Sequence, residues 1–158
     1  MTHNVFSRVL VPTDGSHGSV MAAQLAVELL QDGDGLLTLL YVLDRAVLNE
    51  LGRVDERTLP EVESEMQEHG RRYLEMLRRH AQEKGVPART VMLEGDPFEE
   101  IVALAREIDA DLIAMGHVGQ RGTRRVLLGS VTQRVLDFAH CPVLVVKHVP
   151  PGGGAELP

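Results

Sequence analysis

The sequence predicts an α/β domain in which an open sheet of parallel strands is covered by helices on both faces. Short apolar runs alternate with amphipathic helical stretches, and this unit repeats about four times along the chain. The 158 residues are close to the commonest size of a single domain, and the 44% hydrophobic and 25% charged content is that of a globular protein. We therefore expect one domain over residues 1–149, followed by a flexible tail rich in Pro and Gly over 150–158.

The first two strands and the helix between them have the clearest signals. Arg8–Val11 is a short apolar run, and Pro12 ends it because proline has no N–H for the ladder. From about Gly18 to Leu30, apolar residues recur at helical spacing. Leu36–Val42 is apolar almost throughout, as expected of a strand that is buried on both faces, so we place it centrally in the sheet.

The next stretch, Leu43–Leu59, has no clear hydrophobic period. It mixes charges with a glycine, and we expect a mobile connection with at most a short helical turn. A helix then begins at Thr58, which has Glu61 at the spacing of a capping box. This helix ends before Gly85, since glycine commonly follows a helix C-terminus.

Three further strands and a helix complete the pattern. Arg89–Leu93 is assigned as the third strand from its position between helices. Asp96 has the features of a helix cap, and the helix that follows it ends near Ile108. Asp111–Met115 and Val143–Val146 are the fourth and fifth strands.

The last strand predicts a homodimer. Pro142 precedes it and costs one ladder donor, so the strand begins there or lies at an edge of the sheet. An exposed edge invites pairing with another chain. We expect the dimer to pair through Val143, Leu144, Val145 and Val146.

Composition argues against several classes of partner. The net charge of −7 disfavours nonspecific binding to DNA or RNA, and aromatic residues for base stacking amount to only 3%. No apolar run approaches the roughly 18 residues that span a bilayer, and Met1–Phe6 lacks the features of a secretion signal. The single cysteine, Cys141, forms no internal disulfide and is either a small buried hydrophobe or, as the less favoured alternative, a nucleophile. We expect a cytoplasmic protein without nucleic-acid or membrane partners.

The connection between the fourth strand and the last helix concentrates the chemistry. It is longer than the usual connection of about two to six residues, and long connections are commonly functional. Glycines allow a positive φ and let backbone N–H groups approach an anion. The glycines here are Gly116, Gly119, Gly122 and Gly129. Ser130 and Gln133 then have the spacing of a capping box, which predicts a helix N-terminus, a favourable place for phosphate, at the end of the connection.

The same region is locally basic. No Asp or Glu occurs from Leu112 to Leu136. The arginines of this stretch are Arg121, Arg124, Arg125 and Arg134. A basic run by itself is either a solvated face or part of an anion site, and a glycine-rich loop by itself is often a plain turn. The coincidence of strand, glycines, arginines and helix N-terminus favours the anion site.

Asp14 follows the first strand and is therefore expected at the same edge of the sheet, where open α/β sheets bind their ligands. A carboxylate there suits ribose hydroxyls or an adenine amino group better than phosphate, which it would repel. The alternative is that Asp14, like Ser16, caps the following helix.

The spacing of the glycines after the fourth strand resembles that of a known family. Gly116, two residues, Gly119, nine residues, Gly129 and Ser130 match the ATP-binding signature of the universal stress protein family. The resemblance covers nearly the whole chain, from Val9–Ser16 to Pro142–Lys147. It implies a Rossmann-like parallel sheet of strand order 3-2-1-4-5, ATP in the crevice of that sheet, and a homodimer paired through the last strand.

The resemblance also implies roles for single residues. Pro12, Thr13 and Asp14 would line the adenosine end, and Val42 would meet adenine through its backbone. The ribose and phosphates would be held by Met115, Gly116, His117, Gly119, Gly129, Ser130, Val131 and Thr132. His117 departs from the small or hydroxyl residues frequent in the family, and its ring either bonds a phosphate or ribose or points to solvent. Arg121 and its neighbours would strengthen a polyphosphate site if they turn inward.

Three hypotheses of function follow. We favour an ATP-binding regulatory module of the stress response, whose nucleotide occupancy tunes its conformation or its binding of an unidentified client protein. The alternatives are slow ATP hydrolysis or phosphoryl transfer in the same crevice, and a nucleotide-free dimeric scaffold. Against catalysis, the loop offers only His117 as a general base, and no Walker-type lysine follows it. No residues stand at metal-ligand spacing, so Mg²⁺ or Mn²⁺ would arrive with the triphosphate, held largely by phosphate oxygens and water.

Overall fold

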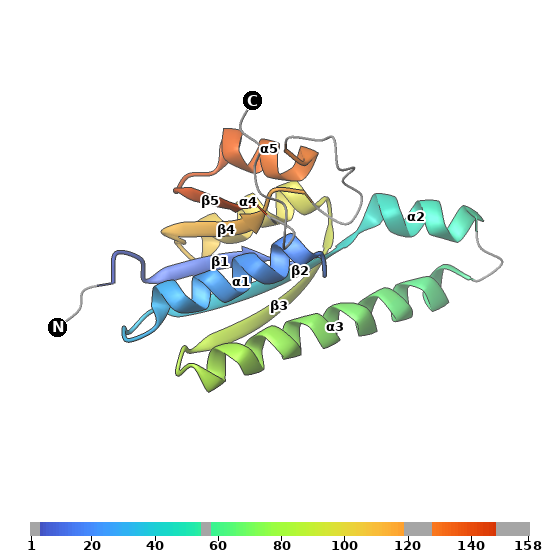
Figure 1. Cartoon of the computed structure of the whole chain (residues 1–158). Coiled ribbons are helices and arrows are strands. Elements are labelled where there is room, and N and C mark those ends of the chain that lie inside the picture. The colour runs from blue at the N-terminus through green and yellow to red at the C-terminus, as the bar shows by residue number, and fades with distance from the viewer. Residues whose placement is uncertain (1–3, 55–57, 119–127, 148–158) are drawn as a thin grey trace, which may run out of the picture.

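The computed structural model describes residues 4–54, 58–118 and 128–147. A five-stranded sheet has the order β3-β2-β1-β4-β5, with every neighbouring pair parallel (Figure 1). The strands are β1 (Arg8–Pro12), β2 (Leu36–Asp44), β3 (Ala88–Gly95), β4 (Leu112–Gly116) and β5 (Val143–Val146). The predicted fold class and strand order are confirmed. The middle strand is β1, and β2 is an interior strand between β1 and β3.

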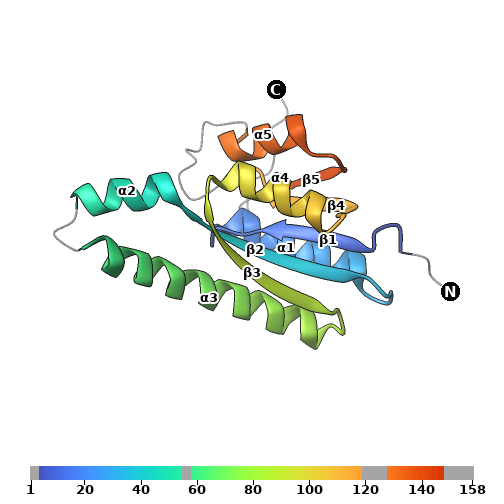
Figure 2. The same cartoon turned by 180° about the vertical axis from the view of Figure 1, so that it is seen from behind.

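Helices cover both faces of the sheet. They are α1 (His17–Leu30), α2 (Arg45–Val54), α3 (Leu59–Glu83), α4 (Pro97–Glu107) and α5 (Ser130–Phe138). Side chains alternate along each strand. Val9 and Val11 therefore pack under α1 and α3, whereas Leu10 packs under α4 and α5. Figures 1 and 2 show these two layers from opposite sides.

Local capping explains where two of the helices begin. The Thr58 backbone N–H donates to the Glu61 carboxylate at 2.8 Å, and the two residues form the predicted capping box of α3. The carboxylate of Asp96 accepts from the backbone N–H of Glu99 at 3.1 Å and caps α4, as predicted. Both signals are local, which is why the sequence predicts them.

The segment Leu43–Leu59 corrects the prediction of a mobile connection with at most a short turn. It contains α2, a helix of 10 residues. Asp44 caps this helix, because its carboxylate accepts from the N–H of Ala46 at 2.9 Å. Only Leu48 of α2 is buried. Val47, Leu48, Leu51 and Val54 recur at helical spacing, and this period is the signal that the prediction overlooked.

Helix α2 and the neighbouring end of α3 extend past the sheet, beyond the carboxyl ends of its strands (Figures 1 and 2). At one side of the sheet, β5 is an edge strand and has only β4 as a neighbour. This agrees with the placement of Pro142 just before it. In the described residues, no helix combines the length and apolar character that a membrane span requires.

Candidate functional site

The sheet has one point where the chain changes direction. From β1 the chain passes through α1 to β2 on one side, and from β4 it passes through α5 to β5 on the other side. In open α/β sheets, ligands bind at such a switch point, beyond the carboxyl ends of the strands. The candidate site is therefore the crevice formed where β1 and β4 end.

The end of β4 lies directly against the first turn of α1. A Cβ atom added to Gly116 would be 2.8 Å from the carbonyl carbon of Gly18 and 2.9 Å from the backbone nitrogen of Ser19. Both neighbours are backbone atoms, which have no room to turn away. Gly116 is thus required by a close approach of two backbones, and this contact fixes the distance across the crevice.

The turn between β1 and α1 satisfies its own polar groups. The Thr13 N–H donates to the Leu40 carbonyl at 2.8 Å, and the Thr13 hydroxyl bonds the Ser19 hydroxyl at 2.9 Å. The Asp14 carboxylate accepts from the N–H of Ser16 at 2.9 Å. Gly15, at φ +81°, adopts a left-handed conformation that suits glycine. The turn holds itself in shape and presents Asp14 at the crevice.

The cap of α1 is Ser16, whose hydroxyl accepts from the N–H of Ser19 at 3.3 Å. Of the two predicted capping residues, Ser16 is confirmed. Asp14 bonds one step earlier, to the N–H of Ser16 itself, and shapes the turn before the helix. The hypothesis that Asp14 caps α1 is therefore wrong.

Val42 lies where β2 extends past β1. The last pair between these strands is Pro12 with Leu40, and Leu40 directs its carbonyl to Thr13. Residues two apart in a strand present their backbone polar groups to the same side. The backbone N–H and C=O of Val42 therefore face the β1 side of the sheet after β1 has ended, as an adenine contact would require.

The two ends of the connection after β4 are joined to each other. The N–H of Gly129 donates to the carbonyl of His117 at 2.6 Å, and the N–H of His117 donates to the carbonyl of Val146 at 3.1 Å. The Thr132 hydroxyl donates to the carbonyl of Gly116 at 2.9 Å. These bonds fix the N-terminus of α5 against the end of β4. They also occupy the N–H groups of His117 and Gly129, which are then not open to a ligand.

The start of α5 corrects the predicted capping box. The cap residue is Gly129, with φ −65° and ψ 152°, and Ser130 is already helical and exposed. Gly129 has no side chain, and none of the described residues supplies a side-chain cap to the helix. The amides of Ser130, Val131 and Thr132 have no acceptor within the helix, since the first turn of any helix lacks one. Any residue can adopt the φ of Gly129. A glycine therefore matters here because it has no side chain, and not because the backbone needs a positive φ.

His117 contains a polar atom that needs a partner. Its Nδ1 is buried and makes no hydrogen bond in the described part of the chain. A buried nitrogen without a partner costs free energy, about 1–3 kcal/mol. The ring therefore does not simply point to solvent through this atom, which weighs against that alternative for His117.

Several predicted site residues offer only backbone groups. The side chains of Thr13, Met115 and Thr132 are 5%, 5% and 3% exposed and pack inside the protein. Pro12 and Val131 are partly buried. Predicted residues that lie outside the described ranges are Gly119, Arg121, Gly122, Arg124 and Arg125.

Arg134, the remaining arginine of the basic stretch, turns to α4. Its guanidinium lies 4.0 Å from the centre of the Phe98 ring, and it forms an ion pair with Asp96 at 3.7 Å. For Arg134 the interpretation as a partly solvated structural residue is the better one.

Sequence reasoning missed Gly18 and Ser19, which form the α1 side of the crevice. Their contacts with Gly116 join positions far apart in the chain, and no local pattern marks them. Ser19 is 4% exposed, and its hydroxyl donates to the Ser16 carbonyl at 2.9 Å while it bonds Thr13. A serine in the first turn of a helix is a weak sequence signal of such a local bond between a hydroxyl and a backbone carbonyl.

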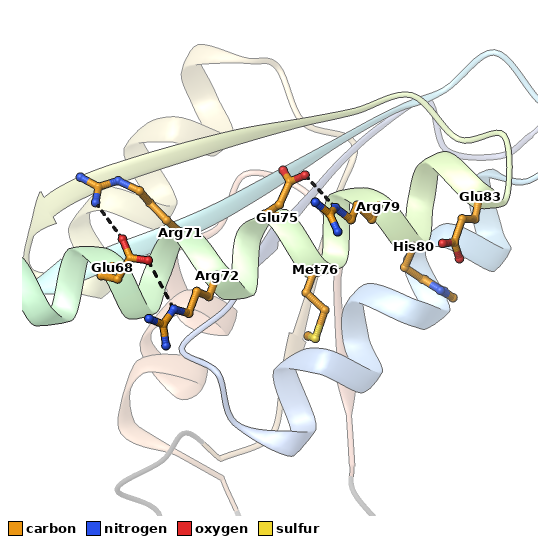
Figure 3. Close-up of a pocket in the computed structure, with 8 residues that line it drawn as sticks. All are labelled: Glu68, Arg71, Arg72, Glu75, Met76, Arg79, His80 and Glu83. Atoms are coloured by element: carbon orange, nitrogen blue, oxygen red, sulfur yellow. Dashed lines mark hydrogen bonds and ion pairs between the residues drawn. The ribbon is translucent and has the colours of Figure 1, made fainter.

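A surface hollow of about 700 Å³ lies elsewhere, along the outer face of α3 (Figure 3). Its lining residues all belong to α3: Glu68, Arg71, Arg72, Glu75, Met76, Arg79, His80 and Glu83. Hydrogen bonds from Arg78, and then from Arg79, lower the pKa of Glu75 to about 2. One helix cannot enclose a ligand, so this is an ion-paired outer face. In the described ranges, no group of three or more metal-binding side chains occurs.

The comparisons with known proteins agree with the fold. The universal stress protein family matches residues 6–147. The chain is 41% identical over 144 residues to universal stress protein MJ0531 of Methanocaldococcus jannaschii, covering 91% of this chain and 84% of that protein. The solved structure of MJ0577, a universal stress protein of the same organism, superposes with a TM-score of 0.80 at 27% identity, covering 91% of this chain and 97% of that one.

A third comparison concerns a universal stress protein family member from Arabidopsis thaliana, solved with AMP bound. It superposes with a TM-score of 0.63 at 22% identity, covering 95% of this chain and 97% of that one. At that identity it shows the shared fold alone.

Proposed function

The chain belongs to the universal stress protein family, and we propose that it is an ATP-binding regulatory module of the stress response. In this proposal, nucleotide occupancy alters the conformation of the protein or its binding of a client protein. The single observation that carries it is the N-terminus of α5, which follows β4 and whose N-cap residue, Gly129, has no side chain to cap it.

The phosphates take the place of that missing cap. A helix N-terminus carries about half a positive charge and free N–H groups, which together favour an anion. The amides of Ser130, Val131 and Thr132 supply these donors. His117 lies beside them, because its carbonyl accepts from Gly129, and a phosphate or ribose oxygen would satisfy its buried Nδ1. Gly119 and Arg121 complete the phosphate side in the proposal.

The adenosine part lies on the other side of the crevice. Asp14 offers a carboxylate suited to ribose hydroxyls, and Pro12 and Thr13 line the same turn. The backbone groups of Val42 are directed past the end of β1, where an adenine edge would meet them. The Arabidopsis protein with AMP bound shows that a chain of this fold holds an adenine nucleotide.

A divalent cation belongs to the proposal as part of the nucleotide. Mg²⁺ or Mn²⁺ would be held by phosphate oxygens and water, because Mg²⁺ sites at triphosphates need few protein ligands. The absence of an acidic residue from Leu112 to Leu136 is consistent with this, since the basic stretch offers no carboxylate to the ion.

We also propose a homodimer that extends the sheet through β5, in the cytoplasm. The strand has only β4 as a neighbour, and Val143, Leu144, Val145 and Val146 are all partly buried. An edge of four aliphatic residues without a charge is the kind that proteins cover. Sedimentation equilibrium measures the assembly directly, and a monomer at micromolar concentration would remove this part of the proposal.

The test of the function is to identify the ligand that purifies with the protein. Freshly purified protein is denatured, the released nucleotide is identified, and its conversion is followed with magnesium present. ATP recovered intact supports the regulatory module. ADP that accumulates with time supports the hydrolase, and the absence of any nucleotide, with no binding of added ATP, supports the scaffold.

A substitution tests the uncapped helix. Gly129→Val places a branched side chain where the phosphate would lie, and we expect ATP binding to be lost while the fold is retained. Isothermal calorimetry measures affinity, and circular dichroism measures the fold. Ala46→Val, on an exposed position of α2, adds similar bulk away from the crevice and should bind ATP normally. If the Gly129 variant binds ATP as the wild type does, the phosphate site lies elsewhere.

A further inference from the structure

A ring from α3 lies on the turn that carries Asp14. A Cβ atom added to Gly15 would be 2.7 Å from Cε2 and 3.0 Å from Cζ of Tyr73. Tyr73 is only partly buried, and its ring reaches over this turn. Nothing in the established family match or in the fold class assigns a role to this contact.

Tyr73 is itself held in place by two further side chains. The ring of His69, one turn earlier on α3, meets it edge-on with 4.8 Å between ring centres. Nδ1 of His69 is hydrogen-bonded to the Tyr41 hydroxyl of β2 at 3.3 Å. Tyr41 is 6% exposed and packs against Gly70, where an added Cβ would lie 2.6 Å from its ring. The ring of Tyr73 is therefore backed by a packed group that reaches into the core.

The Asp14 carboxylate is close enough to this group to act on it electrostatically. Burial, then the negative charge of Asp14, then Tyr73 raise the pKa of Tyr41. Three segments that are distant in sequence thus meet at the turn: the turn itself, β2 and α3.

A glycine at positive φ does not hold its conformation alone. Glycine has more backbone freedom than any other residue, and fixing it costs entropy. The Tyr73 ring packed against Gly15 excludes other backbone conformations of the turn. A binding group that is already in place before the ligand arrives gives higher affinity, because less ordering is left to be done on binding.

We propose that Tyr73 is a positioning residue that holds the Gly15 turn, and with it Asp14, ready for the adenosine part of the nucleotide. This rests on the proposed function, since it assigns Asp14 to the adenosine side. It adds a residue of α3 to the determinants of nucleotide affinity. The contacting atoms are ring carbons, so the ring and not the hydroxyl supplies the effect.

The experiment compares two ligands, ATP and inorganic tripolyphosphate, on three variants of the full chain. Tyr73→Ala should weaken ATP binding about tenfold and leave tripolyphosphate binding within about twofold, because the phosphate side does not depend on the turn. Tyr73→Phe keeps the ring and should bind ATP as the wild type does. Met76→Ala, on an α3 residue that is 47% exposed, is the matched control and should change neither affinity.

A double variant gives a second measurement that needs only ATP. If Tyr73 acts through Asp14, then Asp14→Asn and Tyr73→Ala together weaken ATP binding by less than the product of their separate effects. Separate effects that multiply would overturn the proposal.

Two other results would also overturn it: Tyr73→Ala that binds ATP normally, and Tyr73→Ala that loses both ligands in equal measure, which would give the ring a general structural role. Failure of the proposed function looks different, because the wild-type protein would then bind no ATP at all.

Discussion

Two helices begin at the same edge of this sheet, and they begin in opposite ways. The N-terminus of α1 is capped by the Ser16 hydroxyl, and the preceding turn bonds its own polar groups. The N-terminus of α5 follows Gly129, and no side chain of the described residues caps it. One helix start is thus satisfied by its own residues, whereas in the proposed function the donors of the other are satisfied by a ligand.

The starts of α1 and α5 are both in contact with Gly116, which therefore fixes their separation. Gly116→Ala should produce the largest effect, a loss of about 3 kcal/mol in the free energy of unfolding, because the added methyl would overlap backbone atoms of α1. Denaturant unfolding gives the free energy, and calorimetry should show that ATP binding falls with it.

Gly18→Ala is the graded control for this change. Its Cβ would meet the Cα of Gly116 at 3.3 Å, against the 2.8 Å of the reverse contact, so a smaller loss is expected. If the two alanine variants are equally stable, the backbones are not in the tight contact described and the crevice has more freedom than its geometry implies.

An exchange of caps tests the difference between the helices directly. Ser16→Ala removes a cap and should cost about 1 kcal/mol of stability while changing ATP affinity little. Gly129→Ser adds a cap and should raise stability by a few tenths of a kcal/mol, yet lower ATP affinity about tenfold, because the new hydroxyl occupies the amides.

The two variants should therefore shift stability in opposite directions, and only Gly129→Ser should lower ATP affinity. Denaturant unfolding and calorimetry on the same preparations measure both quantities. If Gly129→Ser binds ATP as tightly as the wild type, the amides of α5 do not hold the phosphate.

The contrast between α1 and α5 also shows what the sequence could predict. The positions of the strands and most helix bounds follow from apolar runs and local caps such as Thr58 and Asp96, which need only neighbouring residues. The strand order follows from the family resemblance instead. The cap of α5 was placed one residue late, because Ser130 with Gln133 imitates a capping box while glycine has no side chain to announce itself. Residue spacing alone cannot distinguish a helix that begins after Gly129 from one that begins after Ser130.

Other features depend on contacts that no local window contains. The helix α2 is different, because Asp44 as a cap and the helical spacing of Val47, Leu48 and Leu51 were local signals that the prediction overlooked. The contact of Gly116 with Gly18 and that of Tyr73 with Gly15 join residues far apart in the chain. In the sequence these residues are only glycines or one position within a long helix, and only the fold shows which residues they contact.

The smallest expected effect concerns the charge at the capped turn. Asp14→Asn removes the second of the three causes that raise the pKa of Tyr41, so this pKa should fall toward the ordinary value of 10.0. It should stay above that value because burial remains. The chain has two tyrosines and no tryptophan, so phenolate absorbance in an alkaline titration reports the change, and Tyr73→Phe isolates the signal of Tyr41.

The sign of the pH effect follows from the direction of this shift. A raised tyrosine pKa means that the fold favours the neutral phenol, so the associated stability is complete below the unfolded pKa and is lost as pH rises through the folded pKa. Asp14→Asn should thus make the protein less sensitive to alkali and leave its stability at neutral pH nearly unchanged. Asp137→Asn, an exposed change on α5, is the control. If Asp14→Asn leaves the pKa of Tyr41 unchanged, the Asp14 carboxylate does not act on the aromatic residues between β2 and α3. The turn before α1 would then be no more closely linked to α3 than the start of α5 is.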